Sequence, residues 1–423
     1  MSSAQPGSTP QNHNGALSVL TSLFFMWGFI TCLNDILVPH LKAVFELNYF
    51  QAMLIQFCFF TAYAVMSIPF GKLVGKLGYK QGVVTGLVIA AVGCLLFYPA
   101  AGAHSYPLFL GALFVLASGI TLLQVSANPY VTLLSPAGKE ARTLTLVQGF
   151  NSLGTTVAPY IGALFILGGT VLAADQIAAM NPAEREAYQA AQAASVQGPY
   201  LVLAGILLTL ALLFFVIRLP RAEDIAEDVS AHAHDHKTSV WQYRHLLLAA
   251  VGLFCYVGAE VAIGSLIVNV LALPEVAGLP EHKAAEYLTW YWGGAMVGRF
   301  IGSAVLNKFD AGKCLAVNAT VNVGLIAIAI LVGGHAAMYA LLAIGFFNSI
   351  MFPTIFSLGA RGLGKFTSAG AGILATAIVG GAIVPVFQGW AADAYGLMPS
   401  FVISAVCYVY IIYFGLSGHK ADD

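Results

Sequence analysis

The segment LPRAEDIAEDVSAHAHDHKTSV, residues 219–240, decides the fold, because it is the one long polar stretch between two strongly apolar parts of the chain. Over its 423 residues the chain is 59% hydrophobic and only 9% charged, whereas soluble domains carry roughly 25% charged residues. This deficit places most of the chain in a lipid bilayer. The formal net charge of −1 gives no basic excess for nucleic acid, so we expect no such partner.

Twelve apolar stretches are long enough to cross a membrane as helices, which takes about 20 residues each. Six precede residues 219–240 and six follow, which predicts an all-α integral membrane protein with twelve spans in two six-helix bundles. We predict a polar N-terminus at 1–16, bundles at 17–218 and 242–416, a linker at 219–241 and a tail at 417–423. The predicted spans are 17–40, 50–71, 80–101, 106–134, 143–169, 198–218, 242–272, 284–306, 311–332, 335–358, 367–390 and 394–416.

Basic residues predict the orientation, because Lys and Arg gather on the cytoplasmic side. Of the 18 Lys and Arg residues, three fall opposite the linker (Lys42, Arg185 and Lys283), which leaves 15 on the linker side. The linker and both termini are therefore expected in the cytoplasm. The polar start MSSAQPGSTPQNHNG lacks the basic region of a signal peptide, so we expect the first span to be retained.

The two halves of the chain repeat each other faintly. Similar strings recur at offsets of 224 to 231 residues, as in LLQVSANPYVTLL against GFFNSIMFPTIFSL and GTTVAP against GGAIVP. Duplicated halves with a central site between them are a common plan of membrane transporters. The matched pairs are Gly71 with Gly302, Gln124 with Asn348, Pro129 with Pro353, Gly154 with Gly380, and Pro159 with Pro385.

Two carboxylates, Asp35 and Glu260, lie deep in predicted spans. An Asp at the centre of a span costs about 2.5–3.5 kcal/mol on insertion scales, and such residues usually face a cavity. The alternative is a structural role, as the cap of a neighbouring helix or the partner of a buried amide. We predict that both side chains face a cavity.

Amides form a second polar set. Gln124 and Asn128 are four residues apart, and Gln148 and Asn151 three apart, so each pair shares a helix face. Hydrogen bonding between helices is the alternative reading, but paired faces favour a shared cavity for a neutral polyol. We find no basic residue at mid-depth for an anion. The predicted ligand-binding residues are Asn34, Gln56, Gln124, Asn128, Gln148, Asn151, Trp292 and Asn348, and Asn269 and Gln388 are further deep amides.

Aromatic residues could support the apolar face of a sugar ring. Trp292 is the candidate platform, whereas its neighbours Trp290 and Tyr291 are expected in the belt at the membrane surface. Trp27, Phe59 and Tyr63 are further candidates, but packing is the favoured role for each.

Catalytic and metal-binding motifs are missing from the sequence. The Gly-rich loop GKLVGKLGYKQG, predicted at 71–82, lacks the Lys-Ser/Thr pair of a phosphate cradle. The HAHDH string in the linker could hold a metal, but its flexible flanks favour a solvated connector. The six cysteines lie apart in apolar stretches and are read as reduced packing residues. We expect no enzyme, no cofactor and transport driven by an ion gradient.

The loop at 71–82 resembles the Gly-x-x-x-Asp-Arg-x-Gly-Arg-Lys signature of the major facilitator superfamily. Gly75 stands where that signature has Asp, and Tyr79 where it has Arg. The strings NDILVPHLKAVFELNYFQAMLIQFCFF, LLQVSANPYVTLL and QGFNSLGTTVAP resemble the fucose–galactose–glucose symporter family, above all its glucose/galactose transporter branch. The positions that match the loop signature, which we assign to an inner gate, are Gly71, Lys76, Gly78 and Lys80.

This resemblance implies alternating access of two bundles around a sugar, in a bacterial inner membrane. Asp35 matches the first-span carboxylate of the L-fucose permease pattern, and Gln124 stands where that pattern has a fourth-span acid. With Glu260 as the second acid, our hypothesis is that Asp35 and Glu260 are the cation-coupling pair. The co-transported ion is H⁺ or Na⁺, and Na⁺ bound at Asp35 and Glu260 stays open. We predict a monomeric hexose symporter for glucose or galactose, with L-fucose or N-acetylglucosamine as alternatives. A proton-coupled exporter of drugs or metabolites and a non-transporting sugar sensor are the rival classes.

Overall fold

The computed structural model describes residues 14–45, 49–103, 105–165, 176, 179–220 and 238–420. Within these ranges the side chains at 33–45, 49–54, 56, 159–165 and a few further positions are not part of the description. The described chain is helical, and no strand occurs in it.

The helices before the linker form the first bundle. Several are longer than a bilayer requires, since about 20 residues suffice. The helices are α1 (Asn14–Phe45), α2 (Tyr49–Leu77), α3 (Tyr79–Gly102), α4 (Tyr106–Leu134), α5 (Glu140–Phe165) and α7 (Pro182–Val216).

The helices after the linker form the second bundle, in which three predicted spans are divided into shorter pieces. It starts with a short η1 (Val240–Gln242), followed by α9 (Arg244–Ala272), α10 (Glu281–Val305), α11 (Ala311–Val332), α12 (Gly334–Asn348) and α13 (Met351–Gly359). The rest comprises η2 (Gly364–Phe366), α14 (Thr367–Thr376), η3 (Ala377–Val379), α15 (Gly380–Tyr395), α16 (Leu397–Ser400), α17 (Val402–Tyr413) and η4 (Phe414–Gly418).

Ten segments of the described chain are long and apolar enough to cross a membrane. The helices α5 and α10 are two further long helices, of 26 and 25 residues, which carry charged residues within their bounds. The all-helical class is confirmed, and the count of twelve spans stays a prediction.

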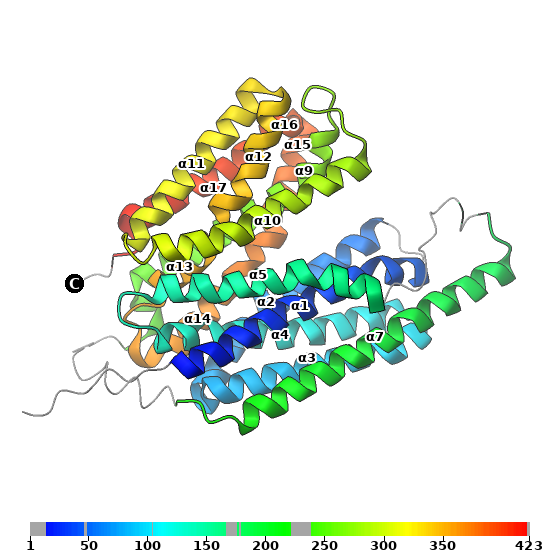
Figure 1. Cartoon of the computed structure of the whole chain (residues 1–423), viewed down its shortest axis with the longest axis horizontal. Coiled ribbons are helices and arrows are strands. Elements are labelled where there is room, and N and C mark those ends of the chain that lie inside the picture. Colours follow the sequence, from blue (N-terminus) through cyan, green and yellow to red (C-terminus); the bar gives the residue numbers. More distant parts are fainter. Residues whose placement is uncertain are drawn as a thin grey trace, which may run out of the picture.

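The two bundles repeat one packing pattern, and Figure 1 shows them as two groups of helices that meet near α13, α14, α2 and α5. In the first bundle α1 packs on α5, α3 on α4 and α7, and α2 on α4. In the second bundle α9 packs on α15, α11 on α12 and α17, and α10 on α12. Each helix pair of the first bundle corresponds to a helix pair of the second. The duplication inferred from short sequence strings therefore extends to the packing of the helices.

Glycines matched between the halves occupy equivalent helix crossings. A Cβ added at Gly154 would lie 2.1 Å from the Phe25 carbonyl oxygen, and one added at Gly380 would lie 2.1 Å from that of Phe254. Only a residue without Cβ allows backbones to approach this closely. The match of GTTVAP with GGAIVP therefore marks the α1–α5 and α9–α15 contacts.

The prediction of a loop at 71–82 is wrong. Helix α2 continues to Leu77 and α3 starts at Tyr79, so Gly78 alone separates them. Its φ of +81° lies in the region that favours glycine. Gly71 and Lys76 therefore lie in α2 and Lys80 in α3, where the Lys80 Nζ donates to the Phe215 carbonyl at 2.9 Å.

The bundles contact each other where α7 ends and α9 begins, which we call the linker end. Gly71 of α2 lies against Ser368 and Gly372 of α14. The Ser303 hydroxyl of α10 donates to the Arg142 carbonyl of α5 at 3.2 Å. Under the repeat α2 corresponds to α10 and α14 corresponds to α5, so the α2–α14 contact corresponds to the α10–α5 contact. The interface between the bundles therefore has an approximate twofold symmetry.

Candidate functional site

Three amides of the first bundle form a hydrogen-bonded series, which we call the amide chain: Gln124 and Asn128 of α4, and Gln148 of α5. The Asn128 Nδ2 donates to Gln124 Oε1 at 2.5 Å, and the Gln148 Nε2 donates to Asn128 Oδ1 at 3.2 Å. Gln124 is half-buried, so this end of the amide chain is partly accessible to a ligand.

Asn151 lies apart from the amide chain. Its Nδ2 donates to the Phe24 carbonyl of α1 at 2.9 Å, in the tight α1–α5 crossing where a Cβ on Gly28 would meet the Asn151 backbone. The side chain thus ties two helices of one bundle together, which is the alternative role that the sequence left open for deep amides.

Glu260 starts the polar network of the second bundle. The Tyr256 hydroxyl, one turn earlier on α9, donates to Glu260 Oε1 at 2.8 Å. The Tyr291 hydroxyl of α10 donates to the Glu260 backbone carbonyl at 3.3 Å. One tyrosine hydroxyl therefore bonds the carboxylate of Glu260, and the other bonds its backbone.

Asn348 continues this network but has no exposed surface. Its Nδ2 donates to the Tyr291 hydroxyl at 3.0 Å, and its Oδ1 accepts from Asn322 at 2.8 Å and from Tyr408 at 2.7 Å. The amide thus connects four helices. Asn348 and its repeat partner Gln124 both lie in polar networks, but only Gln124 is partly exposed.

Arg299 of α10 is the functional candidate that the sequence analysis missed. Its Nη1 contacts the Ser152 hydroxyl of α5, so this side chain joins the two bundles. The expectation of no basic residue at mid-depth stays a prediction, since Arg299 lies in the last two turns of α10. Its Nε is buried, and the described residues provide it no hydrogen-bond partner.

The directions of α9 and α10 could have indicated the relative placement of Glu260 and Arg299. Arg299 lies six residues before the end of α10, so position alone suggested the membrane surface. Cβ atoms tilt toward the N-terminus of their helix. Helix α9 runs away from the linker end, so the Glu260 side chain tilts back toward that end. Helix α10 runs toward the linker end, so the Arg299 side chain tilts away from it. The two side chains therefore tilt toward each other.

Trp292 lies on α10 against Gly264 of α9, one turn beyond Glu260. A Cβ on Gly264 would lie 3.2 Å from the indole ring, and Trp292 remains 45% exposed. The role of Trp292 as a platform for a sugar ring stays a prediction. Tyr291 is fully buried, so its predicted place in the surface belt is wrong, whereas Trp290 is 72% exposed.

Three predicted site residues lie outside the described side chains. They are Asn34 and Asp35 of α1 and Gln56 of α2, and their roles stay predictions. The HAHDH string of the linker, at 232–236, lies outside the described residues altogether. Gln388 of α15 is fully buried and accepts a hydrogen bond from Ser404 at 2.6 Å, so the structure places it within the second bundle.

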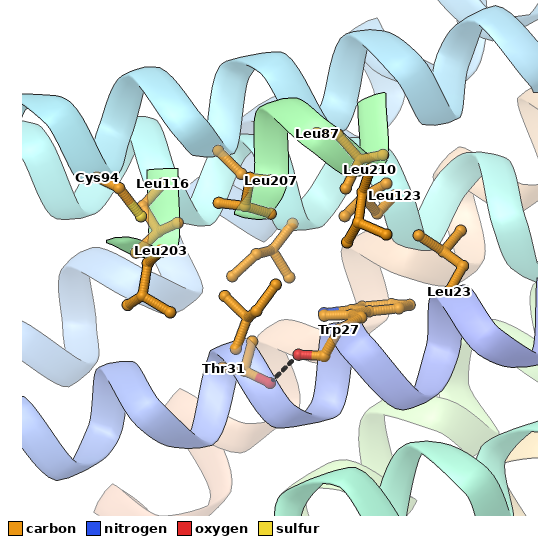
Figure 2. Close-up of a pocket in the computed structure, with 13 residues that line it drawn as sticks. Leu23, Trp27, Thr31, Leu87, Cys94, Leu116, Leu123, Leu203, Leu207 and Leu210 are labelled. Carbon is orange, nitrogen blue, oxygen red and sulfur yellow. Dashed lines mark hydrogen bonds between the residues drawn. The ribbon is translucent and has the colours of Figure 1, made fainter. Parts of the chain in front are cut away.

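One cavity lies inside the first bundle, between α1, α3, α4 and α7. Figure 2 shows leucine side chains around it together with Trp27. Thr31 is the one hydroxyl residue of the lining, and its Oγ1 donates to the Trp27 carbonyl at 2.8 Å. Because a sugar needs hydrogen-bond partners when it leaves water, this cavity does not suit a sugar, and Trp27 serves packing.

Comparison with known proteins gives a consistent result. The model of the Major Facilitator Superfamily matches residues 19–378. A glucose/galactose transporter of Brucella abortus biovar 1 (strain 9-941) is 55% identical over 414 residues, covering 98% of this chain and 96% of the relative. The L-fucose-proton symporter of Escherichia coli (strain K12) is 38% identical, over 94% of this chain and 91% of the relative.

A solved structure extends the comparison to three dimensions. The crystal structure of a major facilitator superfamily transporter, FucP, in the outward conformation superposes with a TM-score of 0.87 at 35% identity. The superposition covers 96% of this chain and 99% of that one.

Proposed function

The chain belongs to the major facilitator superfamily, and we propose that it is a cation-coupled symporter that carries a hexose into the cell. Membership confirms the predicted fold and a multi-pass membrane transporter, and the relatives confirm the resemblance to sugar transporters. The proposed place is the bacterial inner membrane, with the linker in the cytoplasm, because 15 of the 18 basic residues are predicted on that side.

One observation carries the proposal. Each bundle holds a polar network in otherwise apolar helices, and the two networks approach each other at α5 and α10. Amide and hydroxyl groups without excess charge suit a neutral, hydroxyl-rich ligand. Buried polar groups in a membrane are costly, so their concentration at the bundle interface supports a binding site.

The substrate is proposed from relatives whose names state glucose and galactose. In our proposal Gln124 binds sugar hydroxyls, the buried Asn128 and Gln148 position it through the amide chain, and Trp292 lies under the ring. Asn348 then acts indirectly, because it is buried and positions Tyr291. L-fucose, the substrate in the name of a more distant relative, is the alternative, together with N-acetylglucosamine.

The coupling residues are proposed to be Asp35 and Glu260. A carboxylate can bind either H⁺ or Na⁺, and burial favours its protonated form. The relative named as a proton symporter favours H⁺. The conformation is proposed to face outward, because the described contacts between bundles include a closed linker end and a close structural relative was solved in the outward conformation.

Uptake into proteoliposomes tests this function. Purified protein would be supplied with labelled glucose, galactose, L-fucose or N-acetylglucosamine, under an imposed proton gradient and separately a sodium gradient. We expect accumulation of glucose or galactose under one gradient, abolished by an ionophore that dissipates that gradient. Protein-free liposomes provide the control.

Two other outcomes would redirect the proposal. Accumulation of only L-fucose or N-acetylglucosamine would change the substrate and keep the mechanism. No accumulation of any of the four sugars under either gradient would reject the symporter. The same vesicles, tested for proton-driven extrusion of cationic drugs, would then examine the exporter alternative.

A further inference from the structure

Helix α9 packs on α17 and on η4, which continues α17, along one antiparallel contact. The Tyr410 hydroxyl of α17 donates to the Leu248 carbonyl of α9 at 3.0 Å. A Cβ added at Gly252, one turn further along α9, would lie 3.8 Å from both the Tyr410 and the Phe414 rings. A Cβ added at Gly418 would lie 3.5 Å from the Leu248 side chain. As the numbers rise along α9 they fall along α17, which fixes the register of the two helices.

This register brings two cysteines from distant parts of the sequence to the same level of the contact. Cys255 lies three residues beyond Gly252 on α9, and Cys407 lies three residues before Tyr410 on α17. Residues three or four positions apart share a helix face, so both thiols lie on the faces that α9 and α17 turn toward each other. The two thiols also interact with each other, and both cysteines are free.

The surroundings of this thiol pair are apolar and open to the bilayer. Cys407 is buried and Cys255 is half-buried. Val251, one turn before Cys255, is 45% exposed, and Val406, next to Cys407, is 64% exposed. Apolar side chains that a spanning helix leaves exposed lie against lipid tails, which are as apolar as leucine. A neutral, lipid-soluble compound can therefore reach the two thiols.

Two facing thiols in lipid are selective for the ion that they bind. Soft metal ions prefer thiolate ligands, and a thiol that coordinates a metal loses its proton. Two thiolates neutralise a divalent ion, so the complex carries no net charge, which a bilayer would disfavour. Structural zinc takes four ligands, but no group of three His, Cys, Asp or Glu residues occurs in the part of the chain that the structure describes. The pair therefore suits a soft divalent ion that needs only two ligands.

We propose that Cys255 and Cys407 form a two-thiol binding site for a soft divalent metal ion with two ligands, of which mercury(II) is the probe. Neutral mercuric chloride enters through the bilayer. Each thiol gives up one proton, two Hg–S bonds form, and two chloride ions leave with the two protons, so nothing is oxidised or reduced. The bound ion is a bridge between α9 and α17.

The bridge would lie beside the polar network of the second bundle. Tyr256 follows Cys255 and bonds Glu260, and Tyr408 follows Cys407 and bonds Asn348. A bridge therefore fixes the backbone segments that carry both tyrosines, and we expect it to stop transport. This consequence rests on the proposed function, whereas the binding of the metal does not.

The first test measures how firmly mercury is held. A full-length variant that keeps only Cys255 and Cys407 is loaded with one equivalent of mercuric chloride in liposomes, and a competing monothiol is added. Intact-protein mass spectrometry follows the metal. We expect Cys255→Ser or Cys407→Ser in this variant to lower the monothiol concentration that removes half of the mercury by about 100-fold, because a second linked contact strengthens retention by roughly 10²–10⁴.

A variant that keeps only Cys94 and Cys314 is the matched control. These cysteines lie on α3 and α11, in different bundles, so each can hold mercury only singly and should release it like the single-cysteine variants. Equal midpoints for the paired variant and for this control would overturn the site.

The second test uses the wild-type chain, so it does not depend on how a cysteine variant folds. After loading with mercury, the remaining thiols are blocked with a maleimide and the protein is cleaved with trypsin after Lys and Arg. The expected peptides 245–283 and 366–420 contain one cysteine each. We expect one product in which mercury joins these two peptides, and mercury found only on separate peptides would overturn the site.

Sugar uptake separates this site from the proposed function. Mercuric chloride should abolish uptake by the paired variant, and Cys255→Ser in that variant should restore it. A mercury bridge in a protein that takes up no sugar before treatment rejects the proposed function and keeps the site. Normal uptake by a protein that forms no bridge rejects the site and keeps the proposed function.

Discussion

Asn348 holds four helices together through one side chain, with hydrogen bonds to Tyr291, Asn322 and Tyr408. We expect Asn348→Leu to lower the free energy of unfolding by about 2 kcal/mol, at roughly 0.6 kcal/mol for each bond between helices in a membrane. Thermal unfolding in detergent measures the loss. Asn318→Leu is the control, because its Nδ2 bonds only the Cys314 carbonyl of its own helix. Equal losses in the two variants would contradict a special role for Asn348.

Asp35 carries the coupling hypothesis for the first bundle. Replacing it with Asn removes the charge that a cation would neutralise. We expect Asp35→Asn to abolish gradient-driven accumulation of sugar while exchange of internal for external sugar persists, since exchange needs no net movement of the cation. Paired accumulation and counterflow assays measure both. Asp393→Asn, an exposed carboxylate of α15, is the control, and unimpaired accumulation by the Asp35 variant would remove this residue from the mechanism.

At the scale of the helix, close crossings depend on glycine. We expect Gly154→Ala and Gly380→Ala each to cost about 1–3 kcal/mol, the range for overpacked sites. In both, the added methyl group meets a backbone carbonyl that cannot rotate away. Gly205→Ala on α7 has open space around the new methyl group and should be neutral or slightly stabilising. Thermal unfolding of all three in detergent checks the ranking, and a stable Gly380 variant beside an unstable Gly154 variant would argue against equivalent crossings.

Helix boundaries show how far local sequence signals reach. The predicted bounds of α4 and α11 are those observed, because turn residues flank their apolar stretches on both sides. Helix α7 starts 16 residues before the predicted span, which begins at 198. The first turns of α7 are polar, and a hydropathy pattern does not detect polar helical turns. The signal was present as Asn181 and Glu184, which form a reciprocal capping box at the start of α7.

At the scale of the whole molecule, the contact between α2 and α14 offers a direct test of alternating access. A Cβ on Gly75 would lie 3.8 Å from the Cβ of Ser368, within the range of about 3.5–4.5 Å found in disulfides. We expect Gly75→Cys/Ser368→Cys to form a disulfide under mild oxidation and to lose sugar transport, because the linker end can no longer open.

The reducing agent supplies the internal control for this lock. Transport by the double variant should return when the disulfide is reduced, and either single variant should be insensitive to the oxidant. Full transport by the oxidised, cross-linked protein would show that the linker end need not open between α2 and α14.

The sequence by itself determined the helical membrane class, the polar linker, the duplication and the membership of a sugar-transporter family, because span length, composition and recurring strings are properties of contiguous residues. It also identified Glu260 and the amides as unusual, since polar groups in apolar spans are costly wherever they lie. Tertiary structure alone decided that Arg299 contacts Ser152 across the two bundles and that Asn348 is enclosed. Those facts depend on which helices meet and on how their side chains lean, and a hydropathy pattern does not encode the distance between residues far apart in the chain.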